Sequence, residues 1–251
     1  MITVASLWRH PIKSHGREAL ESVTLLQGQT MPFDRHWAVT HEKTHFDSAD
    51  PKWEKCRNFM IGTLVPGLAG IWARLDDATN VMELRHVDLG TISFNPDTAD
   101  GTAAFLNWVA PLTSHVSAKP TNLVSTPGRG MTDTPFPSVS IMNMASHRAV
   151  GDKIGQDLEF ERWRGNIWLD GPDAWAEWDW IGKDIAIGDA VLHVQDRCTR
   201  CNHTKANPVT GLRDIDTLSA LRNGWDHTDF GVYCTVIQSG KVSLGDTAEV
   251  L

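Results

Sequence analysis

Cysteine is scarce in this chain of 251 residues, which has only Cys56, Cys198, Cys201 and Cys234. Four such widely spread thiols do not make a disulfide-dense scaffold, so we expect reduced thiols and a cytoplasmic location. A basic surplus is also missing, because 23 Lys and Arg face 31 Asp and Glu, for a net charge of -8. This balance argues against a surface that binds nucleic acid or an anionic membrane.

Long apolar runs are absent as well. The most apolar stretch, residues 61–73, is broken by Pro66 and by glycines, and it is too short to span a bilayer. Residues 1–7 lack the basic start and the apolar core of a signal peptide, so we expect a first strand there. The remaining composition, with 41% hydrophobic and 22% charged residues, is that of an ordinary globular protein with a substantial core.

Short strands separated by Gly, Pro and Asp dominate the expected secondary structure. The expected strands lie over residues 3–8, 22–26, 36–40, 81–85, 138–143 and 191–195, with a closing hairpin of 232–237 and 241–244. The expected helices lie over residues 102–110, 146–154 and 216–222. Ser146 is the expected N-cap of the second helix, because a serine hydroxyl can accept from free amides there. Few helices and many short strands predict an α+β, predominantly β, barrel-like architecture.

A change of composition divides the chain near its middle. Residues 118–137 contain four prolines and two glycines, which indicates a domain boundary or an exposed active-site loop. We therefore predict an N-terminal β-barrel domain over residues 1–120 and a second β-barrel-like domain over residues 121–251.

The pair Cys198 and Cys201 is the most informative feature of the sequence. Arg197 and Arg200 precede the two cysteines, and a cationic neighbour lowers the pKa of a thiol and favours the thiolate. Four interpretations stay open: a zinc site, a thioredoxin-like redox pair, two inert structural cysteines, or one thiolate ligand for a softer metal. A zinc site needs a second pair of ligands, and the available side chains are not paired at finger spacing: His193, His203, His227 and Cys234.

Motifs along nearly the whole chain resemble those of one family. Arg200-Cys201-Asn202-His203-Thr204, followed by Asn207-Pro208-Val209-Thr210-Gly211, is similar to the signature of MOSC domains, named after the C-terminal domain of molybdenum-cofactor sulfurase. Three upstream motifs resemble those of the same family and of the β-barrel domain that precedes it in amidoxime-reducing proteins: Arg164-Gly165-Asn166-Ile167, His10-Pro11-Ile12-Lys13-Ser14 and Asp34-Arg35-His36-Trp37. The resemblance implies an N-terminal β-barrel domain followed by a MOSC domain.

The resemblance also implies a cofactor and its site. Cys201 would be the catalytic cysteine that ligates the metal of the molybdenum cofactor (Mo-molybdopterin), and Cys198 would be a small buried neighbour. The residues that would bind the anionic cofactor are Lys13, Ser14, Arg35, Arg164, Asn166 and Thr210. Three positions depart from the family pattern and put the substrate more in doubt than the cofactor: His10 replaces a tyrosine, Gly165 a proline and Asn207 an aspartate.

The activity implied by the resemblance is the reduction of N-hydroxylated compounds, such as amidoximes, hydroxylamines and N-hydroxylated bases, with a role in detoxification. The alternative is a molybdenum-cofactor or sulfur carrier module without turnover. No flavin, haem or iron–sulfur motif is visible, so a separate electron-donor protein, a flavin reductase or a ferredoxin-like protein, is the expected partner.

Tryptophan is abundant, with five of the eleven between residues 163 and 180. Core packing is the usual explanation for such a cluster, and an aromatic wall over a substrate channel is the alternative.

Overall fold

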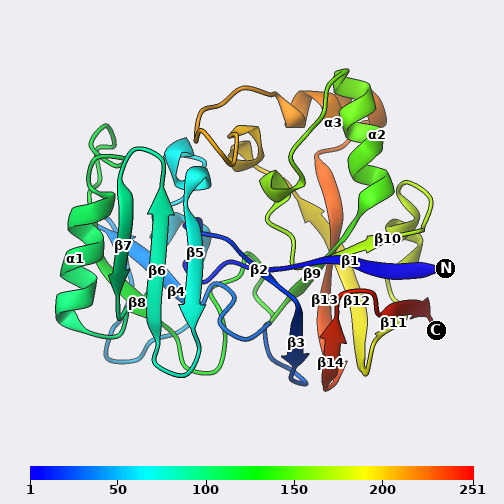
Figure 1. Cartoon of the computed structure of the whole chain (residues 1–251), viewed down its shortest axis with the longest axis horizontal. Coiled ribbons are helices and arrows are strands. Elements are labelled where there is room, and N and C mark those ends of the chain that lie inside the picture. The colour runs from blue at the N-terminus through cyan, green and yellow to red at the C-terminus, as the bar shows by residue number, and fades with distance from the viewer.

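The computed structural model describes all 251 residues, which form two lobes placed side by side (Figure 1). Fifteen strands and three α-helices confirm the predicted fold class, α+β with β predominating. Both chain ends lie on the outer side of the same lobe, away from the other lobe. None of the helices is both long and apolar enough to cross a bilayer.

A closed barrel of seven strands forms the larger lobe. Its strands are β1 (Ile2–Arg9), β9 (Val139–Asn143), β10 (Ile167–Asp170), β11 (Asp184–Ile187), β12 (Ala190–Thr199), β13 (Asp229–Gln238) and β15 (Thr247–Val250). Around the barrel the order is β10-β9-β13-β12-β11-β15-β1, and the pairing of β1 with β10 closes it. Apolar side chains from all seven strands fill the interior, among them Leu7, Ile141 and Leu192.

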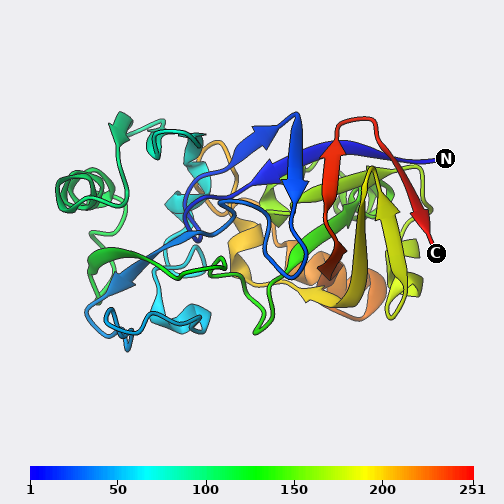
Figure 2. The ribbon, with the colours of Figure 1, turned by 90° about the horizontal axis from the view of Figure 1, so that it is seen from below.

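The first strand of the chain therefore belongs to the barrel that the C-terminal half builds. Two further early strands lie on the same lobe, since β2 (Glu18–Leu20) extends β1 and β3 (Ser22–Leu25) pairs with β14 (Gly240–Ser243). The predicted closing hairpin is wrong for this reason. After the turn at Gly240 the chain leaves β13 and runs along β3 instead. Figure 2 shows these early and late segments side by side.

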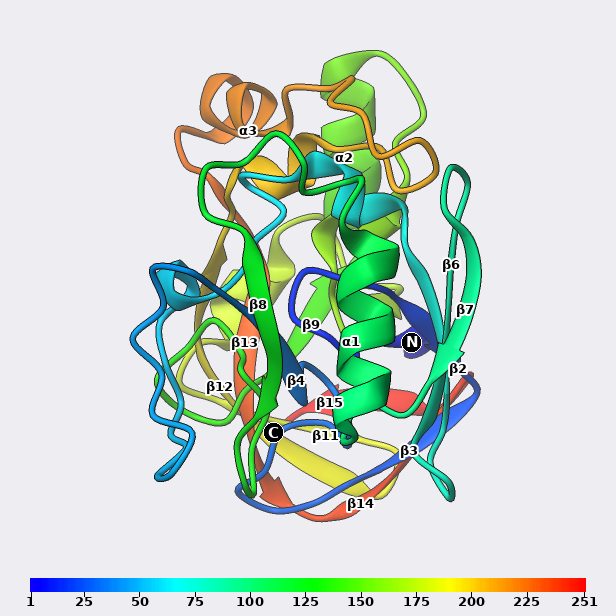
Figure 3. The ribbon, with the colours of Figure 1, turned by 90° about the vertical axis from the view of Figure 1, so that its left-hand side faces the viewer.

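The smaller lobe contains the remaining strands and one helix. A three-stranded sheet is formed by β5 (Trp72–Asp76), β6 (Val81–His86) and β7 (Gly90–Phe94), and a separate pair by β4 (Trp37–His41) and β8 (Pro120–Ser125). Helix α1 (Ala99–Val109) lies between β7 and β8 (Figure 3). The predicted loop 118–137 thus contains strand β8, and the chain stays with the smaller lobe until about Ser125.

Two helices cover one end of the barrel, α2 (Met144–Ile154) and α3 (Thr217–Trp225). The predicted N-cap Ser146 is wrong, because Asn143 caps α2 by accepting from the amide of Ala145. The Ser146 hydroxyl is occupied elsewhere, as it donates to the buried carboxylate of Glu177 at 2.8 Å. Asp216 caps α3 in the ordinary way, through the amide of Ser219.

Candidate functional site

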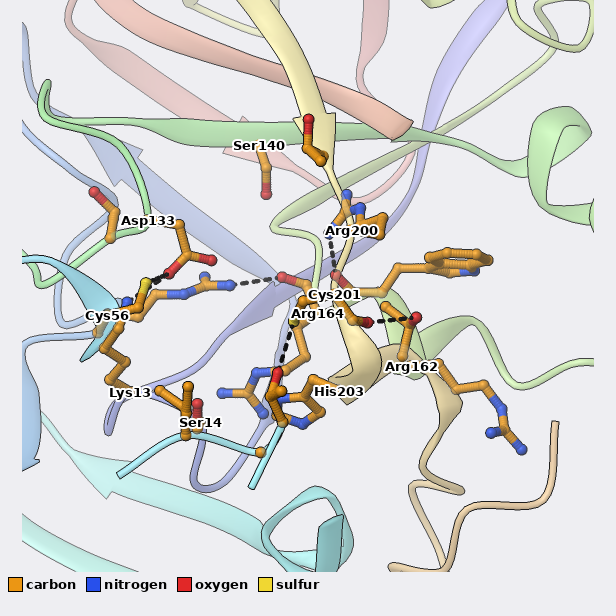
Figure 4. A pocket seen from close by; sticks show the side chains of 18 of the residues that line it. Lys13, Ser14, Cys56, Asp133, Ser140, Arg162, Arg164, Arg200, Cys201 and His203 are labelled. Carbon is orange, nitrogen blue, oxygen red and sulfur yellow. Dashed lines mark hydrogen bonds and ion pairs between the residues drawn. The ribbon is translucent and has the colours of Figure 1, made fainter. Parts of the chain in front are cut away.

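A cavity of about 270 Å³ lies at the seam between the two lobes (Figure 4). Segments from the N-terminal third, around residues 13–14, 35 and 56–63, line one side. The other side is lined by segments from the second half, around residues 132–140, 162–166 and 199–204. The site is therefore a product of lobe packing, because neither half of the sequence contains all of its walls.

Cys201 is the exposed one of the two cysteines that line this cavity, the other being Cys56. Strand β12 ends at Thr199, and Cys201 follows as an exposed residue just before a short 3-10 helix over Asn202–Lys205. The backbone carbonyl of Cys201 accepts from the amide and the hydroxyl of Thr204, and that hydroxyl is also 2.6 Å from the Thr217 hydroxyl of α3. On the opposite side, Thr63 of the smaller lobe donates its hydroxyl to the Cys201 Sγ at 3.2 Å. These contacts hold the sulfur at the cavity wall.

Cys198 lies only three residues away but belongs to the core. Its side chain is fully buried among aromatic and aliphatic residues, as expected for a small neighbour of the ligand. Burial raises the pKa of the Cys198 thiol to about 12, although the charge of Arg200 opposes this shift. The prediction that flanking arginines favour the thiolate is therefore wrong for Cys198. Arg197 lies over the ring of Trp178, with 4.0 Å from its Cζ to the ring centroid.

Two other interpretations of the cysteine pair, a zinc site and a thioredoxin-like redox pair, find little support in the structure. No group of three or more His, Cys, Asp or Glu side chains is arranged to hold a metal ion, so a zinc site lacks its ligand set. Cys201 precedes a short 3-10 helix and Cys198 lies in strand β12, which differs from a redox pair at the start of an α-helix.

Lys13 reaches the cavity from the turn after β1. Its side chain is 4% exposed, and its Nζ donates to the Met131 carbonyl at 2.8 Å and to Asp133 Oδ1 at 2.5 Å. The same carboxylate oxygen accepts from the thiol of Cys56 at 3.1 Å. Ser14 follows in the left-handed region, with φ 64°, and also lines the cavity.

Arg35 is held by a buried carboxylate next to it. Its Nη1 donates to Asp34 Oδ2 at 2.5 Å, and its Nη2 donates to the carbonyl of Arg164 at 2.8 Å. Burial alone would raise the pKa of Asp34, but the Arg35 guanidinium and a hydrogen bond with His10 hold it well below its ordinary value. The pair links the β1–β4 region to the loop that carries Arg164.

The barrel side contributes three more arginines. Arg164 donates through Nη1 to the Gly16 carbonyl at 3.0 Å, whereas its buried Nη2 has no partner. Burial and the charge of Arg35 lower the pKa of Arg164 to about 9, which leaves it protonated at neutral pH. Arg200 donates to the carbonyls of Phe230 and Trp163, and Arg162 pairs with Glu159 and Asp214.

Two of the predicted cofactor-binding residues, Asn166 and Thr210, are placed differently from the cationic ones. Asn166 lines the cavity, but its side-chain oxygen accepts from the amide and hydroxyl of Ser140, and its nitrogen donates to the Trp8 carbonyl. The Asn166 side chain therefore fixes β1 and β9 beside the loop, which is a positioning role and not a contact kept free for a ligand. Thr210 does not reach the cavity: it is exposed in a turn, where its hydroxyl accepts from the Leu212 amide.

Sequence reasoning assigned no site role to four residues that line the cavity, namely Cys56, Thr63, Asp133 and Tyr233, and it considered His203 only as a motif neighbour and a possible zinc ligand. Asp133 lies in the loop that the prolines marked as a possible active-site loop, which is the one signal that could have found it. His203 is 8% exposed, and its ring packs so closely on Gly62 that a Cβ there would lie 2.3 Å from its Nδ1.

The tryptophan cluster is divided between two places. Trp163 lines the cavity and stacks on Phe230, with 4.0 Å between ring centroids. Trp168 and Trp180 are buried in the core. Trp175 is half-buried and packs on Trp178, with 4.9 Å between their ring centroids, and neither of these two lines the cavity. Core packing therefore accounts for most of the cluster.

Taken together, the walls suit an anion that also carries a soft metal. Five cationic side chains line the cavity against a single carboxylate, that of Asp133. An unpartnered guanidinium nitrogen of Arg164 and the accessible Cys201 thiol add a hydrogen-bond donor and a soft ligand. Lys13, Ser14, Arg35 and Arg164 could hold a phosphate, and Cys201 could hold the metal.

Curated relatives are similar to parts of the chain. Mitochondrial amidoxime reducing component 2 of Homo sapiens is 29% identical over 119 residues, which cover 42% of this chain and 35% of the relative. Molybdenum cofactor sulfurase of Drosophila grimshawi is 30% identical over 105 residues, which cover 42% of this chain and 12% of that protein. The chain thus spans about a third or less of the length of these relatives. Among solved structures, the YuaD protein of Bacillus subtilis is 15% identical, with a TM-score of 0.45 over 100% of this chain and 96% of that one.

Two family models match almost the whole chain in succession. The model of the MOSC N-terminal beta barrel domain matches residues 1–107, and the MOSC domain model matches residues 131–249. The segment between them contains β8 and the start of the loop that carries Asp133 to the cavity. The chain is therefore a MOSC-domain protein with an N-terminal MOSC β-barrel domain.

Proposed function

We propose that this protein binds the molybdenum cofactor in the seam cavity and reduces N-hydroxylated compounds there. The observation that carries the proposal is the meeting of the Cys201 thiol with five cationic side chains and one carboxylate in a single cavity. The amidoxime reducing components and the cofactor sulfurase among the relatives support the same cofactor.

Each residue has a role that follows from its position. Cys201 would hold the metal, because a thiolate suits a soft metal centre and this sulfur is accessible from the cavity. Lys13, Arg35 and Arg164 would bind the phosphate of the cofactor through charge-assisted hydrogen bonds, with the Ser14 hydroxyl beside them. Thr63 would keep the Cys201 sulfur in place through its hydroxyl. The bound molybdenum would supply the oxygen-atom removal.

The overall reaction defines what else is needed. An N-hydroxylated substrate takes up two electrons and two protons, loses its oxygen as water, and leaves as an amine or amidine. Hydroxyl-bearing side chains line the cavity, from Ser138, Ser140 and Tyr233. The Ser140 hydroxyl donates to Asn166 and the Ser138 hydroxyl accepts from Thr134, so they make the wall polar mainly as acceptors. The electrons would come from a separate donor protein, a flavin reductase or a ferredoxin-like protein, in a cytoplasmic setting.

The experiment that tests the proposal begins with protein purified from a host that makes the cofactor. We expect about one molybdenum and one pterin per chain, together with steady turnover of benzamidoxime when an artificial reductant is supplied. Protein without molybdenum and pterin would contradict the cofactor assignment. Cofactor that is handed to an acceptor enzyme once, without turnover, would instead support the carrier function that the sulfurase relative suggests.

A further inference from the structure

Asp133 is the one acidic side chain that lines the cavity. Its carboxylate is paired with Lys13, a cationic side chain that the proposed ligand would also bind. Its Oδ1 is 2.5 Å from Lys13 Nζ and 3.1 Å from the thiol of Cys56. Figure 4 shows the three side chains together at one end of the cavity. A carboxylate therefore sits where an anionic ligand would meet the buried lysine.

The other cations of the cavity differ from Lys13 in this respect. Arg35 is neutralised by Asp34, a fully buried residue that does not line the cavity. Arg200 is held by backbone carbonyls, and Arg164 keeps one nitrogen without a partner. Lys13 is thus the only one of these cations whose carboxylate partner itself lines the cavity, where a ligand would bind.

The burial of the two partners is unequal. The Lys13 side chain is 4% exposed, whereas the Asp133 side chain is 54% exposed. A buried ammonium without an anion is unfavourable, so Lys13 needs a counter-charge whether or not a ligand is present. Asp133 has no such constraint, because its carboxylate regains water when it moves away from the lysine.

We propose that Asp133 is an internal competitor that occupies Lys13 in the ligand-free protein and that a phosphate-bearing anion displaces. The exchange replaces one anion by another at Lys13, so the lysine stays paired throughout. Phosphate brings more acceptor oxygens than the carboxylate, so it can pair with Lys13 and still accept from other donors of the cavity. The inference rests on the proposed function only in assigning a phosphate to Lys13.

Cys56 reports on this exchange. Its thiol donates to the same Asp133 oxygen, and burial together with the Asp133 charge raises the pKa of Cys56 to about 11. When the carboxylate is absent and no ligand is bound, as in ligand-free Asp133→Asn, the thiol loses both its charged acceptor and the nearby negative charge. Its reactivity toward an electrophile should then rise.

The test uses inorganic pyrophosphate and the full chain without cofactor. Calorimetry should show that Asp133→Asn binds pyrophosphate roughly tenfold more tightly than the wild type, a change of about 1.4 kcal/mol. In a Lys13→Met background the same substitution should change the affinity less than twofold. An equal gain in both backgrounds would mean a general charge effect and would overturn the competition, as would weaker binding by Asp133→Asn.

A second measurement follows the movement itself. Peptide mass spectrometry gives the alkylation rate of Cys56 by iodoacetamide, and this rate should be several-fold higher in Asp133→Asn than in the wild type. Saturating pyrophosphate should bring the ratio of the two rates close to one, even if the ligand shields the thiol in both proteins. A ratio that pyrophosphate leaves unchanged would show that Asp133 stays on Lys13.

Two controls keep this outcome separate from other failures. Thermal unfolding of Asp133→Asn and of a second variant, Asp133→Ser, checks that each is folded, and either one suffices for the affinity comparison. A protein that binds pyrophosphate as described but contains no molybdenum would contradict the proposed function and leave the competition supported.

Discussion

The two sides of the cavity hold their cationic side chains in different ways. On the side built by the N-terminal third, Lys13 and Arg35 are each paired with a carboxylate. On the barrel side, Arg162 is also paired with carboxylates, but Arg164 and Arg200, the two arginines that follow in sequence, are held by backbone carbonyls. A carboxylate cancels the charge of its partner, whereas a carbonyl leaves the net charge in place. The positive field of the ligand-free cavity therefore comes mainly from the barrel side, next to the Cys201 sulfur.

The largest expected effect separates the two cysteines of the barrel side. Cys201→Ser should lower metal content at least roughly 100-fold, because removal of a ligand exceeds the 10–100-fold effect of losing one of its outer partners. Cys198→Ser should keep most of the metal, since the Cys198 thiol is buried away from the cavity. Metal analysis of the two purified variants makes the comparison, and equal losses would restore the two-sulfur interpretation.

Arg35 provides the sharpest stability test of the carboxylate-paired side. Arg35→Ala leaves the Asp34 carboxylate buried without its guanidinium, which should lower the free energy of unfolding by about 3–5 kcal/mol. The double variant Asp34→Asn with Arg35→Ala should regain a large part of the stability in denaturant unfolding. A double variant as unstable as Arg35→Ala would show that Asp34 is not the reason.

A smaller loss of stability is expected from a substitution at the contact between the two sides of the cavity. Gly62 packs on the ring of His203, so Gly62→Ala forces the ring and the Cys201 loop apart and should cost about 1–3 kcal/mol. The matched control introduces Gly62→Ala into a His203→Ala protein, in which the obstructing ring is absent. There the Gly62→Ala substitution should lower the free energy of unfolding much less. Chemical denaturation of both proteins measures the difference. The same destabilisation with and without the ring would place the strain elsewhere.

The sequence predicted the residues of the site better than their partners. Motifs that are far apart led to Lys13, Arg35, Arg164 and Cys201, and the structure brings these four to one cavity. Each was found because a short run of neighbours marks it. Asp133 and Thr63 have no such run, since their importance arises only when the lobes pack and place them beside Lys13 and the Cys201 sulfur.

The fold shows the same limit. Strand β12 and helix α1 follow from local patterns, and both were expected near their observed positions. The pairing of β14 with β3, and of β1 with β10, joins segments more than 150 residues apart. Local periodicity carries no information on such partners, and a turn at Gly240 looks the same whether the chain folds back or moves to another strand.

The smallest expected effect concerns pH and the buried carboxylate of the N-terminal side. The pKa of Asp34 is held below its unfolded value of about 3.9, so its ionised form stabilises the fold above that pH. This contribution is lost as the pH falls from about 4 toward the lower pKa of the folded state. Unfolding curves should therefore show a weaker acid dependence for Asp34→Asn than for the wild type. Asp170→Asn is the matched control, because Asp170 pairs with Arg148 at the surface and its loss should change the slope much less. Equal slopes for all three proteins below pH 4 would contradict a stabilising Asp34–Arg35 pair.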